Sequence, residues 1–250
     1  MPSVSEQQRI AELLEQADRL RRTRRYALEL SDTFLPAVFL EFFSRDTDRF
    51  PISTVEELAV QESDSIRTGP FGSQLLHSEF TDSGIAVLGI DNAVNNRFEW
   101  VERRFITSQK YDQLRRYTVY PGDVLITIMG TCGRCAIVPD NVGTAINTKH
   151  LCCITLDQAR CLPVYLHATF LHHPFVQHQL GISQKGAIME GLNMEIIKSL
   201  RIQLPPMALQ QQFASLVSRH ERLRASQREA LRQAEHLFQS LLYQAFMVGI

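Results

Sequence analysis

Cysteine and histidine are the residues whose spacing first suggests chemistry, because both can bind a metal ion. Cys132 and Cys135 have the spacing of a zinc knuckle, and His150, Cys152 and Cys153 follow further along the chain. Adjacent cysteines on a strand point to opposite faces, so Cys152 and Cys153 would rarely serve one tetrahedral site. A second Cys-x-x-Cys pair does not occur in the sequence. We therefore expect the thiols to pack as apolar groups, without a metal ion or another cofactor.

Catalytic patterns are also missing from the sequence. Histidines cluster between His167 and His178, but no carboxylate or thiol has the spacing of a catalytic triad with them. A DNA methyltransferase would need a glycine-rich cofactor loop and an Asn/Asp-Pro-Pro-aromatic motif. Leu204-Pro205-Pro206-Met207 has neither the polar nor the aromatic member of that motif. No cluster of carboxylates has the spacing of a metal-dependent nuclease, so we expect a protein that is not an enzyme.

The segment from Arg67 to Gln74 combines one arginine with a glycine-containing run of mostly small residues. Gly69-Pro70-Phe71-Gly72-Ser73 offers backbone N–H groups and a small hydroxyl, which suit close approach to a phosphate or a base edge. Arg67 is long enough to bond guanine or to bind a phosphate. The alternative is a structural turn, in which the glycines supply unusual dihedral angles and Phe71 fills the core.

Two further segments have a similar character. Gly130-Thr131-Cys132-Gly133-Arg134 would either present Thr131 and Arg134 to DNA or form a tight turn between strands. Ser183-Gln184-Lys185-Gly186 carries one cation among polar residues and suits a phosphate contact. The predicted DNA contacts are Arg67, Thr68, Gly69, Phe71, Gly72, Ser73, Gln74, Thr131, Arg134 and Lys185.

The charge balance limits the kind of DNA binding that is expected. The 250 residues include 26 Lys and Arg against 27 Asp and Glu, a formal net charge of −1, and residues 51–204 carry 13 basic and 15 acidic side chains. This balance excludes a protein coated with phosphate-binding side chains. DNA affinity would have to come from a few focused charges, or from a partner subunit that encloses the duplex.

The expected cellular compartment depends on whether the sequence carries a signal peptide or a membrane span. Its first residues have neither the basic nor the apolar region of a signal peptide, and the longest apolar stretch, residues 34–43, is too short to span a membrane. Five cysteines without an export signal indicate reduced thiols. We expect a cytoplasmic protein with no membrane partner.

An internal repeat indicates the elements that flank the candidate loops. Segments near the two ends match at a constant offset of 203 residues, so that Gln7-Gln8 aligns with Gln210-Gln211 and Arg19-Leu20-Arg21 with Arg222-Leu223-Arg224. Both copies have apolar residues at alternating spacings of four and three, which is typical of long paired helices. A capping box formed by Ser5 and Gln8 would start the first helix, and Pro36 should kink or end it.

The two helices are predicted to pair with each other in antiparallel orientation. With their ends aligned, Arg24 would face Gln227 in a buried polar layer that fixes the register. The alternative is that each helix packs on a separate globular surface. The residues predicted to pair the helices are Ile10, Leu13, Leu20, Arg24, Phe213, Leu216, Leu223 and Gln227.

The residues between the helices have a mixed pattern. β-rich runs at 85–90, 120–129 and 151–156 alternate with turn residues, and residues 165–180 have a helical pattern. We therefore predict an α+β fold with one mixed α/β domain at residues 45–204. Two long antiparallel coiled-coil helices, at residues 1–44 and 205–250, would hold it.

Three ordered stretches of the central domain resemble the target-recognition domains of type I restriction–modification systems. The first is Ile66–Leu75 with Ser78-Glu79-Phe80, and the second runs from Tyr120 to Pro139. The third joins Gly191-Leu192-Asn193 to Ile202–Phe213, similar to that family's junction between recognition domain and spacer helix. Together with the duplicated helix, the resemblance to a specificity subunit covers essentially the whole chain.

The resemblance implies a non-catalytic subunit that binds one half of a bipartite site in double-stranded DNA. It would recruit adenine methyltransferase (modification) subunits, and a motor-nuclease (restriction) subunit would join for cleavage. A full-length member carries two recognition domains, whereas this sequence has one between two helices. The resemblance therefore implies a half-length subunit that acts with a second copy of itself or with a missing amino-terminal half. The alternative is a coiled-coil scaffold or regulator of restriction without its own DNA target.

Overall fold

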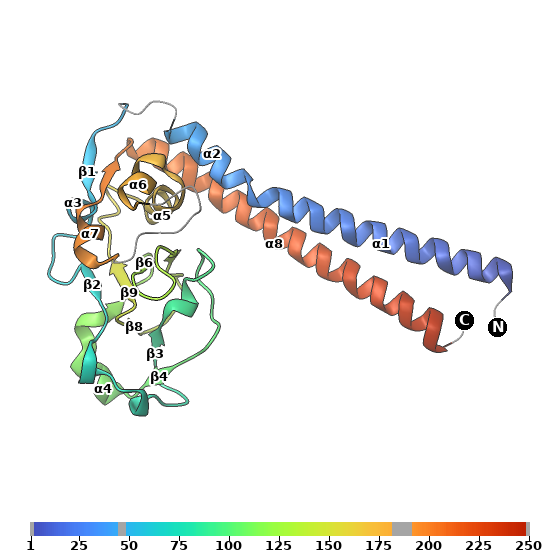
Figure 1. The fold of residues 1–250 in the computed structure, drawn as a ribbon, viewed down its shortest axis with the longest axis horizontal. Coiled ribbons are helices and arrows are strands. Elements are labelled where there is room, and N and C mark those ends of the chain that lie inside the picture. Colours follow the sequence, from blue (N-terminus) through green and yellow to red (C-terminus); the bar gives the residue numbers. More distant parts are fainter. Residues whose placement is uncertain (1–2, 45–48, 182–191, 249–250) are drawn as a thin grey trace. The chain divides into compact units, whose positions relative to one another are not determined.

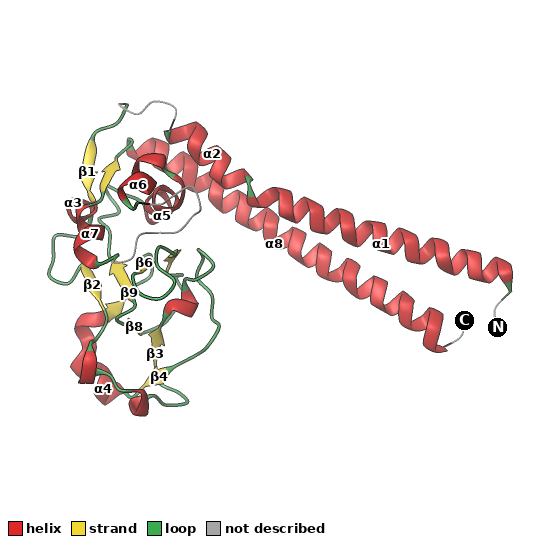
Figure 2. Cartoon of the chain, viewed as in Figure 1, coloured by secondary structure: helices red, strands yellow, loops and turns green. Residues whose placement is uncertain are grey.

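A computed structural model describes residues 3–44, 49–181 and 192–248 of the chain. The fold has two compact units, which Figures 1 and 2 show as ribbons. The helical unit combines the residues up to Val38 with those from Ser215 onward, and the α/β unit extends from Phe39 to Ala214. The predicted combination of one mixed α/β domain with two long helices is confirmed. Among the described residues, no helix is long and apolar enough to cross a membrane.

The long helices are α1 (Val4–Asp32) and α8 (Met207–Tyr243), and α2 (Phe34–Phe43) continues the direction of the chain after α1. Helix α8 is followed by a short π-helix, Gln244–Val248. Helix α1 ends before Pro36 because proline has no N–H to donate to the carbonyl of Asp32. Its amino-terminal cap is Ser3 paired with Glu6, which corrects the predicted box at Ser5.

Within the helical unit, α1 and α8 run antiparallel, as Figure 1 shows and as their contacts require. Arg25 Nη2 lies 2.7 Å from Glu235 Oε1, and the rings of Phe34 and His220 stack at 5.2 Å. The predicted polar layer is not observed. Because Arg25 pairs with Glu235, the neighbouring Arg24 lies level with the turn of α8 around Glu235 and not with Gln227. The Arg24 side chain is exposed.

The seam between these helices differs from the predicted one at three of the predicted leucines. Ile10 and Leu216 are half-buried, and Phe213 is buried against Phe39 and Phe43 in the α/β unit. Leu13, Leu20 and Leu223 are 43%, 41% and 57% exposed, whereas Ala17 and Ala234 are buried. The covered positions alternating with the alanines are one residue later in each heptad: Leu14, Arg21, Leu28, Val217, Arg224 and Leu231. The sequence pattern allows both choices, because long arginine side chains can lie along apolar surface. Arg21 does so, with its guanidinium carbon 3.9 Å from the centre of the Phe238 ring.

Two four-stranded sheets form the frame of the α/β unit. One is antiparallel, in the order β2 (Ile66–Thr68), β9 (Leu151–Ile154), β6 (Val124–Thr127), β7 (Cys135–Ile137). The other has the order β4 (Phe105–Ile106), β3 (Ile85–Leu88), β8 (Ala145–Asn147), β5 (Thr118–Val119), with β3 and β8 parallel. A two-stranded sheet pairs β1 (Ile52–Thr54) with β10 (Arg201–Gln203).

Short helices connect and cover these strands. Their bounds are α3 (Val55–Leu58), α4 (Ser108–Leu114), α5 (Pro163–His172), α6 (Pro174–Gln179) and α7 (Met194–Ser199). Sequence periodicity predicted a single helix at 165–180, but the chain forms α5 and α6 with a break at His173. Pro174 causes the break, because the residue before a proline is driven out of the helical region, and His173 has ψ 119°.

The apolar core of the α/β unit lies mainly on the facing strands. Leu88, Leu125 and Leu151 are fully buried in one cluster of this core, and the partly buried Trp100 packs against that cluster. Four of the five thiols are buried, as predicted, and burial raises the pKa of Cys152 to about 12. These thiols therefore stay protonated and pack as small apolar groups. The described part of the chain holds no group of three or more side chains suited to a metal ion.

Candidate nucleic-acid interface

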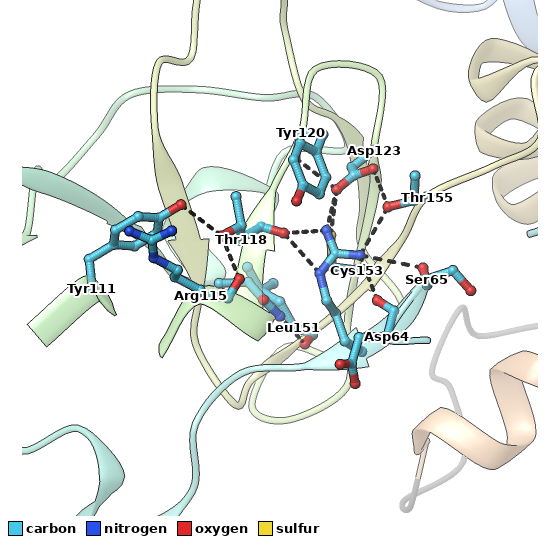
Figure 3. Close-up of polar contacts among 12 residues, drawn as sticks. Asp64, Ser65, Tyr111, Arg115, Thr118, Tyr120, Asp123, Leu151, Cys153 and Thr155 are labelled. Carbon is cyan, nitrogen blue, oxygen red and sulfur yellow. Dashed lines mark hydrogen bonds and ion pairs between the residues drawn. The ribbon is translucent and has the colours of Figure 1, made fainter. Parts of the chain in front are cut away.

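Arg67, the first predicted DNA contact, lies inside the α/β unit rather than on its surface. It is 5% exposed, and its Nη2 atom is 2.6 Å from Oδ2 of Asp123, which is 1% exposed. Nε donates to the carbonyl of Thr118 at 2.9 Å, and Nη1 donates to Thr155 Oγ1 at 2.9 Å. In Figure 3, dashed lines join Asp123, Thr118 and Thr155 to one unlabelled guanidinium, which these contacts identify as that of Arg67.

The carboxylate of Asp123 is satisfied on both oxygens. Thr155 donates to Oδ1 at 2.7 Å, and the backbone N–H of Tyr120 and the thiol of Cys153 donate to Oδ2 at 2.9 and 3.1 Å. Burial alone would lower the pKa of Arg67, but the attraction of Asp123 holds that pKa above its ordinary value. Arg67 therefore remains charged, and its donors are engaged within the protein. This corrects the expected role of Arg67: it positions strand β2 instead of contacting DNA.

The loop after β2 carries the remaining residues of the first predicted segment. A Cβ atom on Gly69 would lie 2.1 Å from the backbone oxygen of Asn147, so only glycine lets this loop pass so close to β8. Beyond it, Phe71, Gly72, Ser73 and Gln74 are all exposed, and Thr68 is half-buried. Phe71 is 48% exposed, so it does not fill the core as the structural alternative proposed.

The second predicted segment forms the turn between β6 and β7. Thr127 organises it, because its Oγ1 accepts from the backbone N–H of Arg134 at 2.8 Å and its carbonyl accepts from Gly133 at 2.8 Å. Thr131 and Arg134 are exposed at this turn, and Arg134 makes no ion pair with any residue that the structure describes. The tight turn and the exposed side chains therefore occur together, rather than as alternatives.

A third segment, which sequence reasoning missed, joins these two loops. The turn Thr148–His150 connects β8 to β9. The carbonyl of His150 accepts from Ile128 N at 2.9 Å, and Gly69 packs against Thr148 on the other side. Lys149 is half-buried here and has no acidic partner among the described side chains. The sequence signal that could have indicated this turn was a lysine followed by a histidine between two β-rich runs.

These segments together form one surface, which we call the loop surface: residues 68–76, 129–134 and 148–150. Lys149 and Arg134 give it local positive charge despite the net charge of −1. Burial, together with the nearby charges of Lys149 and Arg104, lowers the pKa of His150, so its ring is neutral near pH 7. The predicted contact Lys185 lies outside the described residues.

Comparisons with known proteins give consistent results. The family model "Type I restriction modification DNA specificity domain" matches residues 75–235. A search of curated proteins finds no match. The fold is similar to a chain from "Structural basis underlying complex assembly and conformational transition of the type I R-M system", with a TM-score of 0.65 and 17% identity over 98% of this chain and 60% of that one.

Two further solved structures are similar. The HsdS subunit from Thermoanaerobacter tengcongensis has a TM-score of 0.56 and 16% identity, over 98% of this chain and 59% of that one. The Type-I restriction-modification system S subunit from M. genitalium has a TM-score of 0.58 and 11% identity, over 96% and 60%. The chain thus spans about three fifths of the length of these structures.

Proposed function

Because the chain belongs to the type I restriction modification DNA specificity domain family, we propose that it is a DNA-binding specificity subunit of a type I restriction–modification complex. It binds one half of a bipartite site in double-stranded DNA and recruits adenine methyltransferase subunits, and the motor-nuclease subunit joins that complex for cleavage. The chain itself is not catalytic, and it acts in the cytoplasm. The observation that carries the proposal is the family match together with the loop surface.

The contacts proposed on DNA are the exposed residues of the loop surface. Gly72, Ser73 and Gln74 approach the backbone or base edges, and Thr131 with Arg134 does so from the neighbouring turn. Phe71, Thr68 and Gly69 shape the first loop. Lys149, added from the structure, and Lys185 bind phosphates, whose neutralisation supplies most of the sequence-independent affinity.

Methyl transfer is the direct test of this function. The purified chain alone should transfer no methyl group to DNA, and the same chain mixed with its methyltransferase subunit should methylate adenines at a defined site. Activity of the chain alone, abolished by a point substitution within it, would contradict the non-catalytic role. A mixture that methylates DNA no better than the methyltransferase subunit alone would favour a scaffold or regulator.

Two recognition domains are proposed for the active form. One domain reads only a few base pairs, yet a genome offers on the order of a million or more competing sites. Helix α8 has 37 residues, so it is about 55 Å long and matches about 16 base pairs. It can therefore space two half-sites by more than one turn of DNA. A second copy of the chain, or a missing amino-terminal half, would supply the second recognition domain.

The spacing of the methylated sites tests this assembly. Two copies related by a two-fold axis would methylate an inverted repeat with a fixed gap. Sites with the gap lengthened or shortened by a few base pairs should lose methylation. A continuous asymmetric target, or methylation that does not depend on gap length, would contradict an assembly with two recognition domains.

A further inference from the structure

A cleft in the α/β unit lies directly beside the turn Thr148–His150. It consists of two hollows of about 180 and 380 Å³, and both are lined by His77, Phe80, Thr148 and His150. Lys149 lines the smaller hollow, and Asp91, Glu102 and Arg104 line the larger one. Because the two hollows share these walls, they adjoin each other, and we call them together the loop cleft.

The loop cleft contains hydrogen-bonding groups that the described protein does not satisfy. Arg104 Nε and Thr148 Oγ1 are buried and have no hydrogen-bond partner in the described residues. Buried polar groups in native proteins nearly always have a partner, so each exception needs an explanation. Because Arg104 and Thr148 both line the larger hollow, two side chains at its wall keep hydrogen-bonding capacity that the described protein does not use.

The guanidinium of Arg104 is held in place at this cleft. Nη2 forms an ion pair with Asp91 Oδ1, and Nη1 lies 3.7 Å from Glu102 Oε2. Gly89 leaves room for the pair, because a Cβ atom there would lie 2.6 Å from Arg104 Nη2 and 2.8 Å from Asp91 Oδ1. The Arg104 side chain is still 25% exposed, so it is both oriented and accessible.

The charges of the cleft select among the acceptors that DNA offers. A phosphate in the larger hollow would meet the carboxylates of Asp91 and Glu102, which repel it. A base edge carries no net charge and avoids this repulsion. Guanine presents two acceptors, O6 and N7, in the major groove, and arginine is the side chain that most often binds them.

We propose that the loop cleft recognises a guanine, with Arg104 donating to its major-groove edge and Thr148 making a second contact. Asp91 is a positioning residue that orients Arg104, and Lys149 at the rim binds the adjoining phosphate. This assignment rests on the proposed function and gives the chain a specificity-determining residue outside the loops predicted from the sequence.

The experiment uses the full chain together with its methyltransferase subunit. The complex selects sites from a randomised duplex library, and 7-deazaguanine, which lacks the N7 acceptor, then replaces each guanine of the selected site in turn. At one guanine the wild-type complex should lose about tenfold in affinity, since a bidentate contact is worth about 1–3 kcal/mol and half of it is removed. The Arg104→Gln complex should bind the normal and modified duplexes equally well.

The controls separate this role from a structural one. Arg103→Gln removes the neighbouring arginine, which is exposed and lies over Trp100, and should leave the response to 7-deazaguanine unchanged. Lys149→Ala should weaken binding to all sequences alike. Because the modified base changes only the DNA, misfolding of a variant cannot produce the wild-type response.

Each remaining outcome contradicts one specific claim. Selection of a site without sensitivity to 7-deazaguanine at any guanine would overturn the assignment of Arg104 and leave the proposed function intact. An Arg104→Gln complex that still loses tenfold at the same guanine would also overturn it. A wild-type complex that selects no site at all would contradict the proposed function, and the assignment with it.

Discussion

The two units of the chain place their charged residues in different surroundings. In the α/β unit, Arg67 and Asp123 are 5% and 1% exposed, and both are satisfied by partners from several strands. In the helical unit, Arg25 and Glu235 are 51% and 43% exposed, and they form an ion pair with each other across the helix pair. The buried pair fixes how the strands around it are arranged. The exposed pair adds little to the helix register, which apolar packing already sets.

This difference shows where recognition and spacing are encoded. Under the proposed function, the loops of the α/β unit must meet specific groups on DNA, which requires unique side-chain placement. The helical unit needs length, and its buried Gln227 Oε1 has no hydrogen-bond partner among the described residues. Removing the buried charge of Asp123 should therefore harm the first unit, and removing the amide of Gln227 should stabilise the second.

The largest effect is expected from Asp123→Ala in the α/β unit. Removing the carboxylate leaves the Arg67 guanidinium charged, buried and without its ionic partner, which should destabilise the unit by about 3–5 kcal/mol. Urea unfolding followed by the fluorescence of Trp100, the single tryptophan of the chain, measures this change. Arg116→Ala is the matched control, because its ion pair with Asp64 is 62% and 37% exposed. An equal loss in both variants would contradict the contrast.

The next effect is a loss of stability in mild acid, also in the α/β unit. Burial, and the charge of nearby His167, lower the pKa of His172 to about 4, and burial lowers the pKa of His167 and His173. The folded state then binds protons less readily than the unfolded state. Stability should be complete above the ordinary histidine pKa of about 6.5 and fall as the pH drops towards 4, by up to about 3 kcal/mol for His172.

The same Trp100 fluorescence, recorded in urea at pH 7, 6, 5 and 4, measures this dependence. His172→Gln should have a shallower dependence than the wild-type chain, because it removes a group whose pKa burial lowers to about 4. A pH profile identical in both proteins would show that His172 does not titrate as its burial implies.

A smaller, opposite effect is expected in the helical unit. Gln227 Oε1 is buried without a described hydrogen-bond partner, so Gln227→Leu should stabilise the helix pair by about 1 kcal/mol. Circular dichroism at 222 nm during thermal unfolding reports on the long helices and should show a higher midpoint. A lower midpoint would mean that the amide contributes to the register after all.

The smallest effect belongs to the exposed pair of the helical unit. A double-mutant cycle of Arg25→Ala and Glu235→Ala should give a coupling energy of about 0.2–1 kcal/mol, decreasing as salt is added. A coupling above about 2 kcal/mol would erase the difference from the buried pair of the α/β unit.

Some of this contrast could be predicted from the sequence. The helical repeat, the break near Pro36 and the two turn-forming segments all depend on local pattern, and local pattern is what a sequence displays. The exposed loop residues Ser73, Gln74, Thr131 and Arg134 were found in this way. The sequence could not show whether Leu20 or Arg21 lies in the seam between the helices, because both positions fit the heptad spacing.

The role of Arg67 could not be predicted, because its partners are distant in the sequence. Asp123 lies 56 residues away and Thr155 lies 88 residues away, and no periodic pattern connects them. The same reason hid Lys149 and Arg104. Lys149 meets the predicted loops through the packing of Gly69 on Thr148 and the hydrogen bond from Ile128 to His150. Arg104 reaches the same turn through the pairing of β4 with β3 and of β3 with β8. An isolated glycine-rich run was informative about exposure but not about which neighbouring cations complete the surface.

The arrangement around Arg67 has a consequence for the order of events in folding. Its hydrogen bonds reach from Asp64 to Thr155, so the guanidinium is desolvated favourably only after strands β2, β5, β6 and β9 have met. Contacts between residues so far apart form late and cooperatively. A nascent chain that has not yet produced Thr155 therefore has no ordered loop surface to offer. Under the proposed function, competence to bind DNA would begin only when the domain is complete, and unfinished chains would not occupy sites on the genome.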